Sequence, residues 1–260
     1  MTDIEFSSQM GVELIESWGS DAKVAQSARV STLGLDNNRK RVTGLVKALW
    51  RDGHFSPFES SGMTVAFDVP LFISQQLTRH KSFAFSVKSL RYSEAAPKFY
   101  TPDATRPLIQ TGKALDYRRE PGTVHQDIQV TSAHEAAATH SYDLYTAMIN
   151  DGICDEVARN VLPTSLYTQL WMTGSLRSWL HFLNQRADKH AQHEIQEAAN
   201  KIKHIIQDTY PTTFEAWSVN PYVMARAVID ELELELELTA HCDDCGYHEI
   251  HGSYDTRFEN

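Results

Sequence analysis

The stretch QLTRHKSFAFSVKSLRY, residues 76–92, is the part of the sequence that says most about both the fold and the function. It gathers five side chains that can carry positive charge: Arg79, His80, Lys81, Lys88 and Arg91. The whole chain has a formal net charge of −10, so this stretch is a local concentration of cations on an acidic protein. Charge-assisted donors placed close together are typical of a site for a phosphate or another small anion. Charge alone is equally compatible with a solvated surface segment.

The segment before this stretch predicts a strand followed by a helix. Residues 63–69, MTVAFDV, alternate and are rich in β-branched and aromatic residues, which is typical of a strand. Pro70 is well placed to open a helix over residues 70–80, because proline is tolerated in the first helical turn. That helix would carry Gln76 and Arg79 on one face near its C-terminal end, since they are three residues apart.

The remaining elements are expected from periodicity and from breakers. Pro57 excludes a helix interior from the segment HFSPFES, residues 54–60, which is expected to be a loop. The breaker-rich residues 93–125 are expected to form an irregular excursion that serves as a lid or an interface arm. ELELELEL, residues 231–238, alternates like a strand, although leucine and glutamate both favour helices. Helical patterns cover residues 11–29 (with a second piece starting at Asp21), 40–51, 126–150, 155–161 and 175–208, and a second strand is expected over 165–173.

Composition narrows the class of protein. The 260 residues are 42% hydrophobic and 22% charged, as in soluble globular proteins, and the length fits one large domain or two small ones. No apolar run approaches the roughly 18 residues of a membrane helix, and the first residues lack the pattern of a signal peptide. Three cysteines are too few for a disulfide scaffold, so we expect a cytoplasmic protein. The acidic balance argues against broad nucleic-acid binding but leaves room for a small anionic substrate.

A second group of basic residues lies in SLRSWLHFLNQRADKH, residues 175–190. Arg177 and His181 are four residues apart, as are Arg186 and His190, so each pair would share a face of a helix. The alternative is an ordinary helix with solvated basic residues. His181, between a leucine and a phenylalanine, is also compatible with a hydrogen-bonded core histidine.

Taken together, these motifs resemble the flavin-dependent thymidylate synthases. The spacing Arg79-His80-Lys81, seven residues, Ser89 and then Arg91-Tyr92 is similar to the family signature RHR-x7-S. The longest similarity is the run of residues 162–196, LPTSLYTQLWMTGSLRSWLHFLNQRADKHAQHEIQ. Three shorter segments also resemble family elements: ARVS (28–31), HFSPFES (54–60) and ARNVLP (158–163).

The resemblance implies a fold, a reaction and an assembly. The fold is an α/β (α+β) one, with a central, largely antiparallel sheet flanked by helices. The reaction is the methylation of dUMP to dTMP, with methylenetetrahydrofolate as carbon donor and NADPH as reductant through bound FAD. Reduced flavin supplies the hydride, while the protein orients the reactants and stabilises charge. The family members are homotetramers, with each active site assembled from several subunits.

The resemblance also assigns roles to residues of this chain. Arg186 is expected to be catalytic, because its fixed charge beside the pyrimidine carbonyls would stabilise anionic character on the ring. Ser89 is expected to assist it. The residues expected to bind the nucleotide are Gln76, Arg79, Val87, Ser89, Leu90, Arg91, Arg159 and Arg186. Those expected to bind the flavin are Ser31, His54, Ser56, Arg79, His80, Lys81, Ser175, Arg177, His181 and His190, with Glu59 as a hydrogen-bond acceptor in the same loop.

The chain departs from the family pattern around the pyrimidine and the flavin. Lys81 replaces the third arginine of the triplet, keeping the charge but losing the planar fork. Ser86 and Val87 replace an Asn-Glu pair, so a carboxylate between flavin and nucleotide is missing. Ser175 and His181 stand where flavin-binding asparagines are usual. These departures put the choice of pyrimidine and product in question, more than the fold.

Three hypotheses for the function therefore stand side by side. The first is the methylation of dUMP, and the second is a related one-carbon transfer, namely hydroxymethylation of dUMP or use of dCMP. The third is a nucleotide-binding homologue without activity. The family-like domain is expected over residues 1–217, and residues 218–260 form a C-terminal extension. Cys242, Cys245, His248 and His251 offer zinc ligands there, but their gaps are shorter than in usual zinc fingers, so a metal-free end is expected.

Overall fold

The computed structural model describes residues 3–34, 41–113 and 116–219. The chain divides into two compact units, Met1–Ala216 and Trp217–Asn260. The alternating segment 231–238 and the candidate zinc ligands lie outside the described residues, so the role of the extension stays a prediction. Among the helices that the structure describes, none is long and apolar enough to cross a bilayer.

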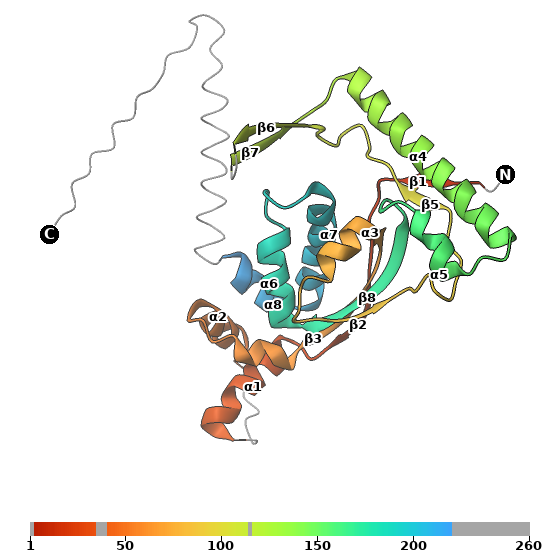
Figure 1. Ribbon diagram of the computed structural model, residues 1–260. Helices are drawn as coiled ribbons and strands as arrows, with labels where there is room; N and C mark the ends of the chain where they lie inside the picture. The colour runs from red at the N-terminus through yellow and green to blue at the C-terminus, as the bar shows by residue number, and fades with distance from the viewer. Residues whose placement is uncertain (1–2, 35–40, 114–115, 220–260) are drawn as a thin grey trace, which may run out of the picture. The chain divides into compact units, whose positions relative to one another are not determined.

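A four-stranded antiparallel sheet forms the centre of the first unit (Figure 1). Its strands follow the order β2 (Gly11–Trp18), β3 (Gly62–Pro70), β8 (Tyr167–Ser175) and β4 (Ala84–Val87). β3 pairs with β8 along its whole length, and all of its residues except Ala66 and Asp68 are buried. This arrangement confirms the predicted fold class.

Three helices cover one face of the sheet: α3 (Leu71–Leu77), α6 (Leu176–Arg186) and α7 (His193–Thr209) (Figure 1). The alternation of β8 explains the choice of face, because Leu170 and Met172 are buried while Gln169 and Trp171 are exposed. Trp179 of α6 is fully buried in this layer and donates its indole N–H to the carbonyl of Met63 over 3.1 Å. The sheet and α6 are therefore joined by packing and by a hydrogen bond.

A second, smaller core lies beside the sheet. It is built on the parallel pair β1 (Glu5–Ser7) and β5 (Lys98–Tyr100), with α4 (Val124–Asn150), α5 (Asp155–Ala158) and the 3₁₀ helix η2 (Arg159–Val161). Phe99, Tyr142 and Tyr145 are buried there, and the Tyr145 hydroxyl accepts a hydrogen bond from the Ala95 N–H over 3.0 Å. α4 begins with a capping box between Thr123 and Gln126.

The N-terminal helices and the last of the described helices meet at one end of the first unit. These elements are α1 (Asp21–Leu33), α2 (Thr43–Arg51), the 3₁₀ helix η1 (Ser56–Ser60) and α8 (Pro211–Ser218). The Asp21 carboxylate accepts hydrogen bonds from the Thr212 and Thr213 backbone N–H groups over 2.9 and 3.0 Å. A carboxylate at the start of a helix is favourable because it satisfies free N–H groups and the helix dipole.

Two elements near the start of the chain differ from their predictions. Residues 11–18 form β2 instead of helix, because Val12 and Leu14 pair with Phe67 and Val65 of β3. Pairing with a distant strand outweighs local propensity. The helix expected over 70–80 ends at Leu77.

Two longer segments also differ from their predictions. Residues 93–125 contain β5 and the hairpin β6 (Ile109–Lys113) and β7 (Asp116–Glu120), so the irregular excursion is partly ordered. β5 escaped prediction because its partner, β1, lies about ninety residues earlier in the chain. The helix expected over 175–208 is broken between Arg186 and His193.

Candidate active site

Arg186 lies half-buried at the last position of α6 and contacts His80. Its Nε atom donates a hydrogen bond to His80 Nε2 over 3.0 Å. His80 is 8% exposed and meets the Phe182 ring edge-on, with ring centroids 4.9 Å apart. Because Nε2 accepts from Arg186, the proton of a neutral His80 must be on Nδ1. The predicted catalytic arginine is thus held by a predicted flavin residue and does not point into bulk solvent.

The guanidinium groups of Arg79 and Arg186 lie close enough for their charges to interact. Burial, and then the neighbouring charge of Arg79, lower the pKa of Arg186 from its usual value, yet an arginine stays charged at any ordinary pH. The Arg79 guanidinium makes no hydrogen bond or ion pair with any residue that the structure describes. Positive charge is therefore left uncompensated beside Arg186, which is the condition for binding an anion.

His80 is kept neutral by its surroundings. Burial, followed by the charges of Arg186 and His181, lowers the pKa of His80 to about 4. The unfolded chain would bind a proton at this imidazole from about pH 6.5 downward, whereas the folded chain does so only near pH 4. Since the unfolded state binds more protons in this window, stability falls as the pH is lowered from 6.5 to 4.

We therefore predict that acidification costs the wild type more stability than it costs His80→Phe, which keeps a ring in the same place. The difference between the two proteins should change by about 2 kcal/mol between pH 7 and pH 4.5, allowing for water near the ring. Urea unfolding at both pH values measures it. Parallel losses in the two proteins would contradict a neutral, depressed His80.

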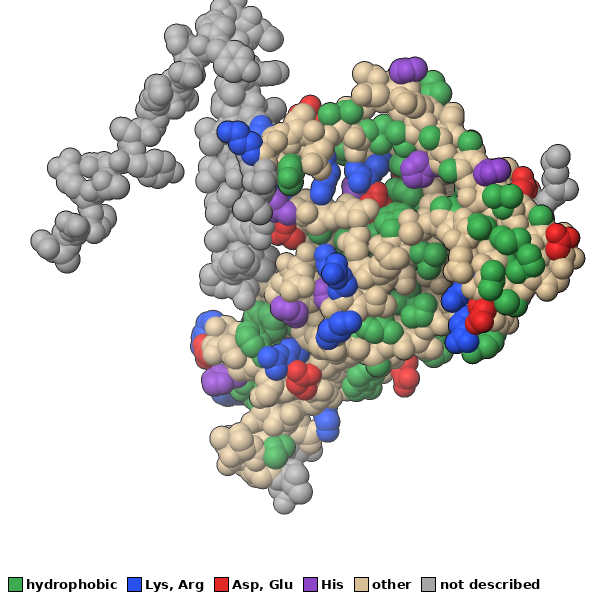
Figure 2. Space-filling model, viewed as in Figure 1, with side chains coloured by type: hydrophobic (Ala, Val, Ile, Leu, Met, Phe, Trp, Pro, Cys, Tyr) green, Lys and Arg blue, Asp and Glu red, His purple; other side chains and the backbone are tan. Residues whose placement is uncertain are grey.

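Polar side chains line α6 from its start to Arg186. Arg177 forms an ion pair with Glu59 of η1 over 3.3 Å, which joins the HFSPFES segment to α6. His181, one turn further on, is exposed, and its Nε2 lies 3.0 Å from the Gln185 amide nitrogen. Figure 2 shows Lys, Arg and His side chains gathered over this part of the molecule. The pair Arg177–His181 shares a face as predicted, and the alternative of a core histidine at 181 is wrong.

This band of donors fits a flavin dinucleotide chemically. Such a cofactor carries a pyrophosphate, which needs cations and N–H or O–H donors. The exposed side chains of His54, Ser56, Lys81, Arg177 and His181 offer these groups near the two ends of α6 and in the turn after His80. Ser175 is committed differently, because its hydroxyl caps α6 by accepting from the Ser178 N–H over 3.2 Å.

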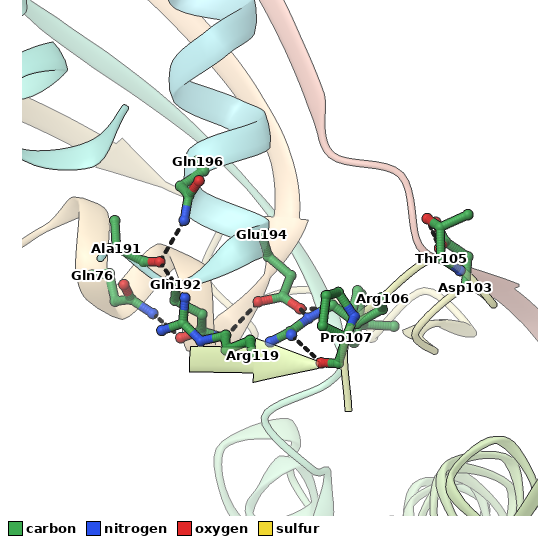
Figure 3. Close-up of polar contacts among 11 residues, drawn as sticks. Gln76, Asp103, Thr105, Arg106, Pro107, Arg119, Ala191, Gln192, Glu194 and Gln196 are labelled. Atoms are coloured by element: carbon green, nitrogen blue, oxygen red, sulfur yellow. Dashed lines mark hydrogen bonds and ion pairs between the residues drawn. The ribbon is translucent and has the colours of Figure 1, made fainter. Parts of the chain in front are cut away.

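A chain of hydrogen bonds that sequence reasoning missed starts at Gln76 of α3, three residues before Arg79 (Figure 3). Gln76 donates its amide N–H to Gln192 Oε1 over 2.6 Å, and Gln192 donates to Glu194 Oε2 over 2.8 Å. Glu194 is 3% exposed, and its other oxygen accepts from Tyr100 over 2.7 Å and from Arg106 over 2.6 Å. The resemblance had included the AQHEI segment without assigning these roles. No signal in the sequence marks these roles, because the burial of Glu194 and its partners Tyr100 and Arg106 appear only in the structure.

Several other predicted nucleotide residues have contacts with α5, with the α4–α5 core or with one another. Arg91 pairs with Glu156 over 3.1 Å, and its guanidinium lies 5.3 Å from the Tyr92 ring centroid. Ser89 Oγ accepts from the Arg91 N–H over 3.3 Å. Leu90 packs against the α4–α5 core. Arg91 is thus paired with a carboxylate, whereas Arg79 has no such partner among the described residues.

Three further predicted residues lie outside α6. Ser31 is on α1, where its hydroxyl donates to the Ala28 carbonyl over 3.1 Å. Val87 ends the edge strand β4 and is 44% exposed. His190 lies beyond the end of α6, with Nδ1 2.8 Å from Asp188 Oδ1. The helical face predicted for Arg186 and His190 is therefore wrong, because the helix stops at Arg186.

Comparison with known proteins places the chain among characterised relatives. Residues 13–212 match the family model Thy1, described as thymidylate synthase complementing protein. A flavin-dependent thymidylate synthase of Streptomyces coelicolor is 37% identical over 231 residues, covering 84% of this chain and 94% of the relative. One from Thermotoga neapolitana is 37% identical over 206 residues, covering 79% and 89%.

Solved structures give the same result. The crystal structure of a UMP/dUMP methylase, PolB from Streptomyces cacaoi, bound with 5-Br UMP, is similar with a TM-score of 0.78 and 36% identity. The similarity covers 84% of this chain and 97% of that one. The same protein bound with 5-Br dUMP gives a TM-score of 0.78, covering 84% and 98%. The segment matched by the family model, residues 13–212, includes Arg79 and Arg186.

Proposed function

We propose that this chain, which belongs to the flavin-dependent thymidylate synthase family, converts dUMP to dTMP with methylenetetrahydrofolate as carbon donor and NADPH as reductant. The observation that supports this most is the position of Arg186. It is a half-buried arginine fixed by a neutral histidine and placed beside the unpaired cation of Arg79. Such a pair suits an anionic nucleotide that gains further negative character during the reaction.

The protein contributes positioning and charge in this proposal. Arg186 would stabilise anionic character on the pyrimidine carbonyls, and a charge that is held in place beforehand needs little reorganisation when the reaction begins. His80 would keep the Arg186 guanidinium in one orientation by accepting from its Nε. Because His80 is neutral, it adds no charge that would oppose Arg79 and Arg186.

Bound FAD would supply the two electrons by which a methylene unit becomes a methyl group, drawn from NADPH. His54, Ser56, Lys81, Arg177 and His181 are the side chains that we propose to hold it, with His80 and Arg79 at the same end as Arg186. Ser31, Ser175 and His190 stay predictions for this role. The folate would then be a co-substrate that meets the nucleotide in the same place.

We propose that the site is shared between the subunits of a homotetramer. Within one chain Arg91 is bound to Glu156, whereas Arg79 has no such partner among the described residues. In the assembled site Arg91 would exchange Glu156 for a nucleotide phosphate. Half-exposed ion pairs such as Arg91–Glu156 contribute only about 0–1 kcal/mol, so this exchange costs little.

The proposal predicts that purified protein, supplied with FAD, dUMP, methylenetetrahydrofolate and NADPH, forms dTMP. Chromatography of the nucleotide products measures the outcome, and omission of the folate is the control. Only 5-hydroxymethyl product, or turnover of dCMP alone, would support the related one-carbon transfer in its place. A protein that binds dUMP but yields no product, with flavin that NADPH does not bleach, would support the inactive homologue.

A second candidate is methylation of the ribonucleotide UMP. It is favoured by the similarity to PolB, which is described as a UMP/dUMP methylase and was crystallised with analogues of both nucleotides. We predict that dUMP is preferred, by at least about tenfold in kcat/KM, which corresponds to about 1.4 kcal/mol of differential binding in the transition state. Competition between the two nucleotides in one reaction measures this ratio. A ratio near one or below would favour the dual or ribonucleotide activity.

A further inference from the structure

Glu194 is a buried carboxylate with a complete set of donors. Its side chain is 4% exposed, and it accepts from the Tyr100 hydroxyl, from Arg106 Nε and from the Gln192 amide. Burial opposes ionisation, but the hydrogen bonds from Arg106 and Tyr100 outweigh it and lower the pKa of Glu194 below its usual value. Glu194 is therefore an ionised group that can only accept hydrogen bonds.

An acceptor at Glu194 fixes the orientation of two amides in turn. Gln192 must present its NH₂ group to Glu194, so its carbonyl oxygen faces Gln76. Gln76 must then present its own NH₂ group to Gln192. Figure 3 shows the Gln76 carbonyl oxygen on the side away from Gln192, and this oxygen has no partner among the described residues. An amide that could otherwise flip is held with its acceptor outward.

We propose that Glu194 and Gln192 are positioning residues that hold the Gln76 carbonyl oxygen toward the nucleotide, as a hydrogen-bond acceptor. This rests on the proposed function, in which Gln76 contacts the nucleotide. The group that meets this oxygen is a donor, either a sugar hydroxyl or the pyrimidine N3–H, and not the phosphate, because two acceptors repel. Arginine and serine residues remain for the phosphate.

The hydrogen-bonded series Gln76–Gln192–Glu194 is held in place by residues outside the central four-stranded sheet. Arg106 lies between β5 and β6, and Arg119 of β7 donates to the Ala191 carbonyl over 3.0 Å. Figure 3 shows both arginines reaching toward the segment before α7. Gln196 holds that same segment by donating to the Ala191 carbonyl over 2.6 Å, but it takes no part in the contact with Gln76. Gln196 is therefore a matched control for Gln192.

The first experiment measures the dissociation constant of dUMP with FAD-loaded protein by calorimetry. Gln192→Leu, which leaves the pairing of Glu194 with Arg106 and Tyr100 in place, is expected to weaken binding about tenfold, the effect of one lost or mispaired hydrogen bond. Gln196→Leu is expected to change it less than threefold. Equal weakening by both variants would mean that Gln192 and Gln196 only keep the segment before α7 in its shape, and would overturn the proposal.

A second variant, Gln192→Glu, should give dUMP binding a pH dependence that is not expected if Gln192 only holds the segment in shape. Gln192→Glu places two carboxylates together, which raises the pKa of the new one. When ionised, that residue is repelled by Glu194 and is expected to leave its place between Glu194 and Gln76. When protonated, it has the donor and acceptor pattern of Gln192 and returns to that place. Binding of dUMP by Gln192→Glu, relative to wild type at the same pH, should therefore improve several-fold as the pH falls from 8 to 6. A constant ratio across this range would contradict the proposal.

Two nucleotide analogues distinguish the donor that Gln76 meets. N3-methyl dUMP removes the ring N–H, and 2′,3′-dideoxyuridine monophosphate removes the sugar hydroxyl. The wild type should bind one of them about tenfold more weakly than dUMP, and Gln76→Leu should abolish that difference. If both penalties persist in Gln76→Leu, the proposal is wrong. If the wild type binds no pyrimidine nucleotide, the proposed function fails and this inference with it, whereas tight wild-type binding unaffected by Gln192→Leu overturns the inference alone.

Discussion

Arg186→Lys should lower kcat for dTMP formation by about 10²–10³-fold while the protein stays folded, because a transition-state charge stabiliser is lost. Lysine keeps one positive charge but has no Nε–H at the position that bonds His80, and it has no planar fork. Its ammonium would also be free to move away from Arg79. Steady-state kinetics with dUMP as the varied substrate measure the effect, which should appear in kcat more than in KM.

The matched control for this substitution is Arg51→Lys. Arg51 ends α2, is exposed, and pairs only with the adjacent Asp52 among the contacts described, so kcat should not change. Arg186→Ala adds a sharper readout, because guanidinium ions in solution should restore part of the lost rate. A kcat for Arg186→Lys within threefold of wild type would show that the charge at this place does not act on the reacting pyrimidine.

Trp179→Ala should lower the free energy of unfolding by about 3–5 kcal/mol, the cost typical of removing a large aromatic from a core. The indole is fully buried, with ring centroids 4.7 Å from Phe83 and 5.8 Å from Phe182. Its loss would leave a cavity under His80, whose ring packs on the same two phenylalanines. The Met63 carbonyl would lose its side-chain donor as well.

Thermal unfolding of the variant measures this effect, and a decrease in Tm of roughly 10 °C is expected for a domain of this size. Trp179→Phe, which keeps a ring but loses the indole donor, should lie between the variant and the wild type. Val124→Ala, at an exposed position at the start of α4, should leave Tm unchanged within about 1 °C. A loss in Trp179→Ala no larger than that in Val124→Ala would contradict the role of Trp179 in joining α6 to the sheet.

Local sequence patterns were sufficient to locate the elements that are specified mainly by residues close together in the chain. The helices at 43–51 and 124–150, the strands β3 and β8, and the start of α1 at Asp21 lie close to where periodicity, capping residues and prolines placed them. β2 and β5 were missed, because each is stabilised by a partner far away in the chain. The break after Arg186 was missed because the helical pattern continues through residues that leave the helix.

The motif spacing identified the residues around Arg186, but it did not predict the contacts that these residues make. His80, Arg79 and Arg186 were all chosen from the sequence, and the structure brings them together. The choice of Ser31 and of His190 depends on resemblance alone, and the contacts described for them are with Ala28 and Asp188. Gln192 and Glu194 could not be chosen, because their role depends on Tyr100 and Arg106, about ninety residues away.

The sequence by itself determined the family, the central sheet and the basic residues that an anionic nucleotide requires, because these depend on residue type and on short spacing. Only the tertiary structure decided that His80 is neutral, that Arg186 is held by it, and that a buried carboxylate orients Gln76. Protonation states and amide orientations depend on burial and on partners brought together from distant segments. Those partners are neighbours in space and not in sequence.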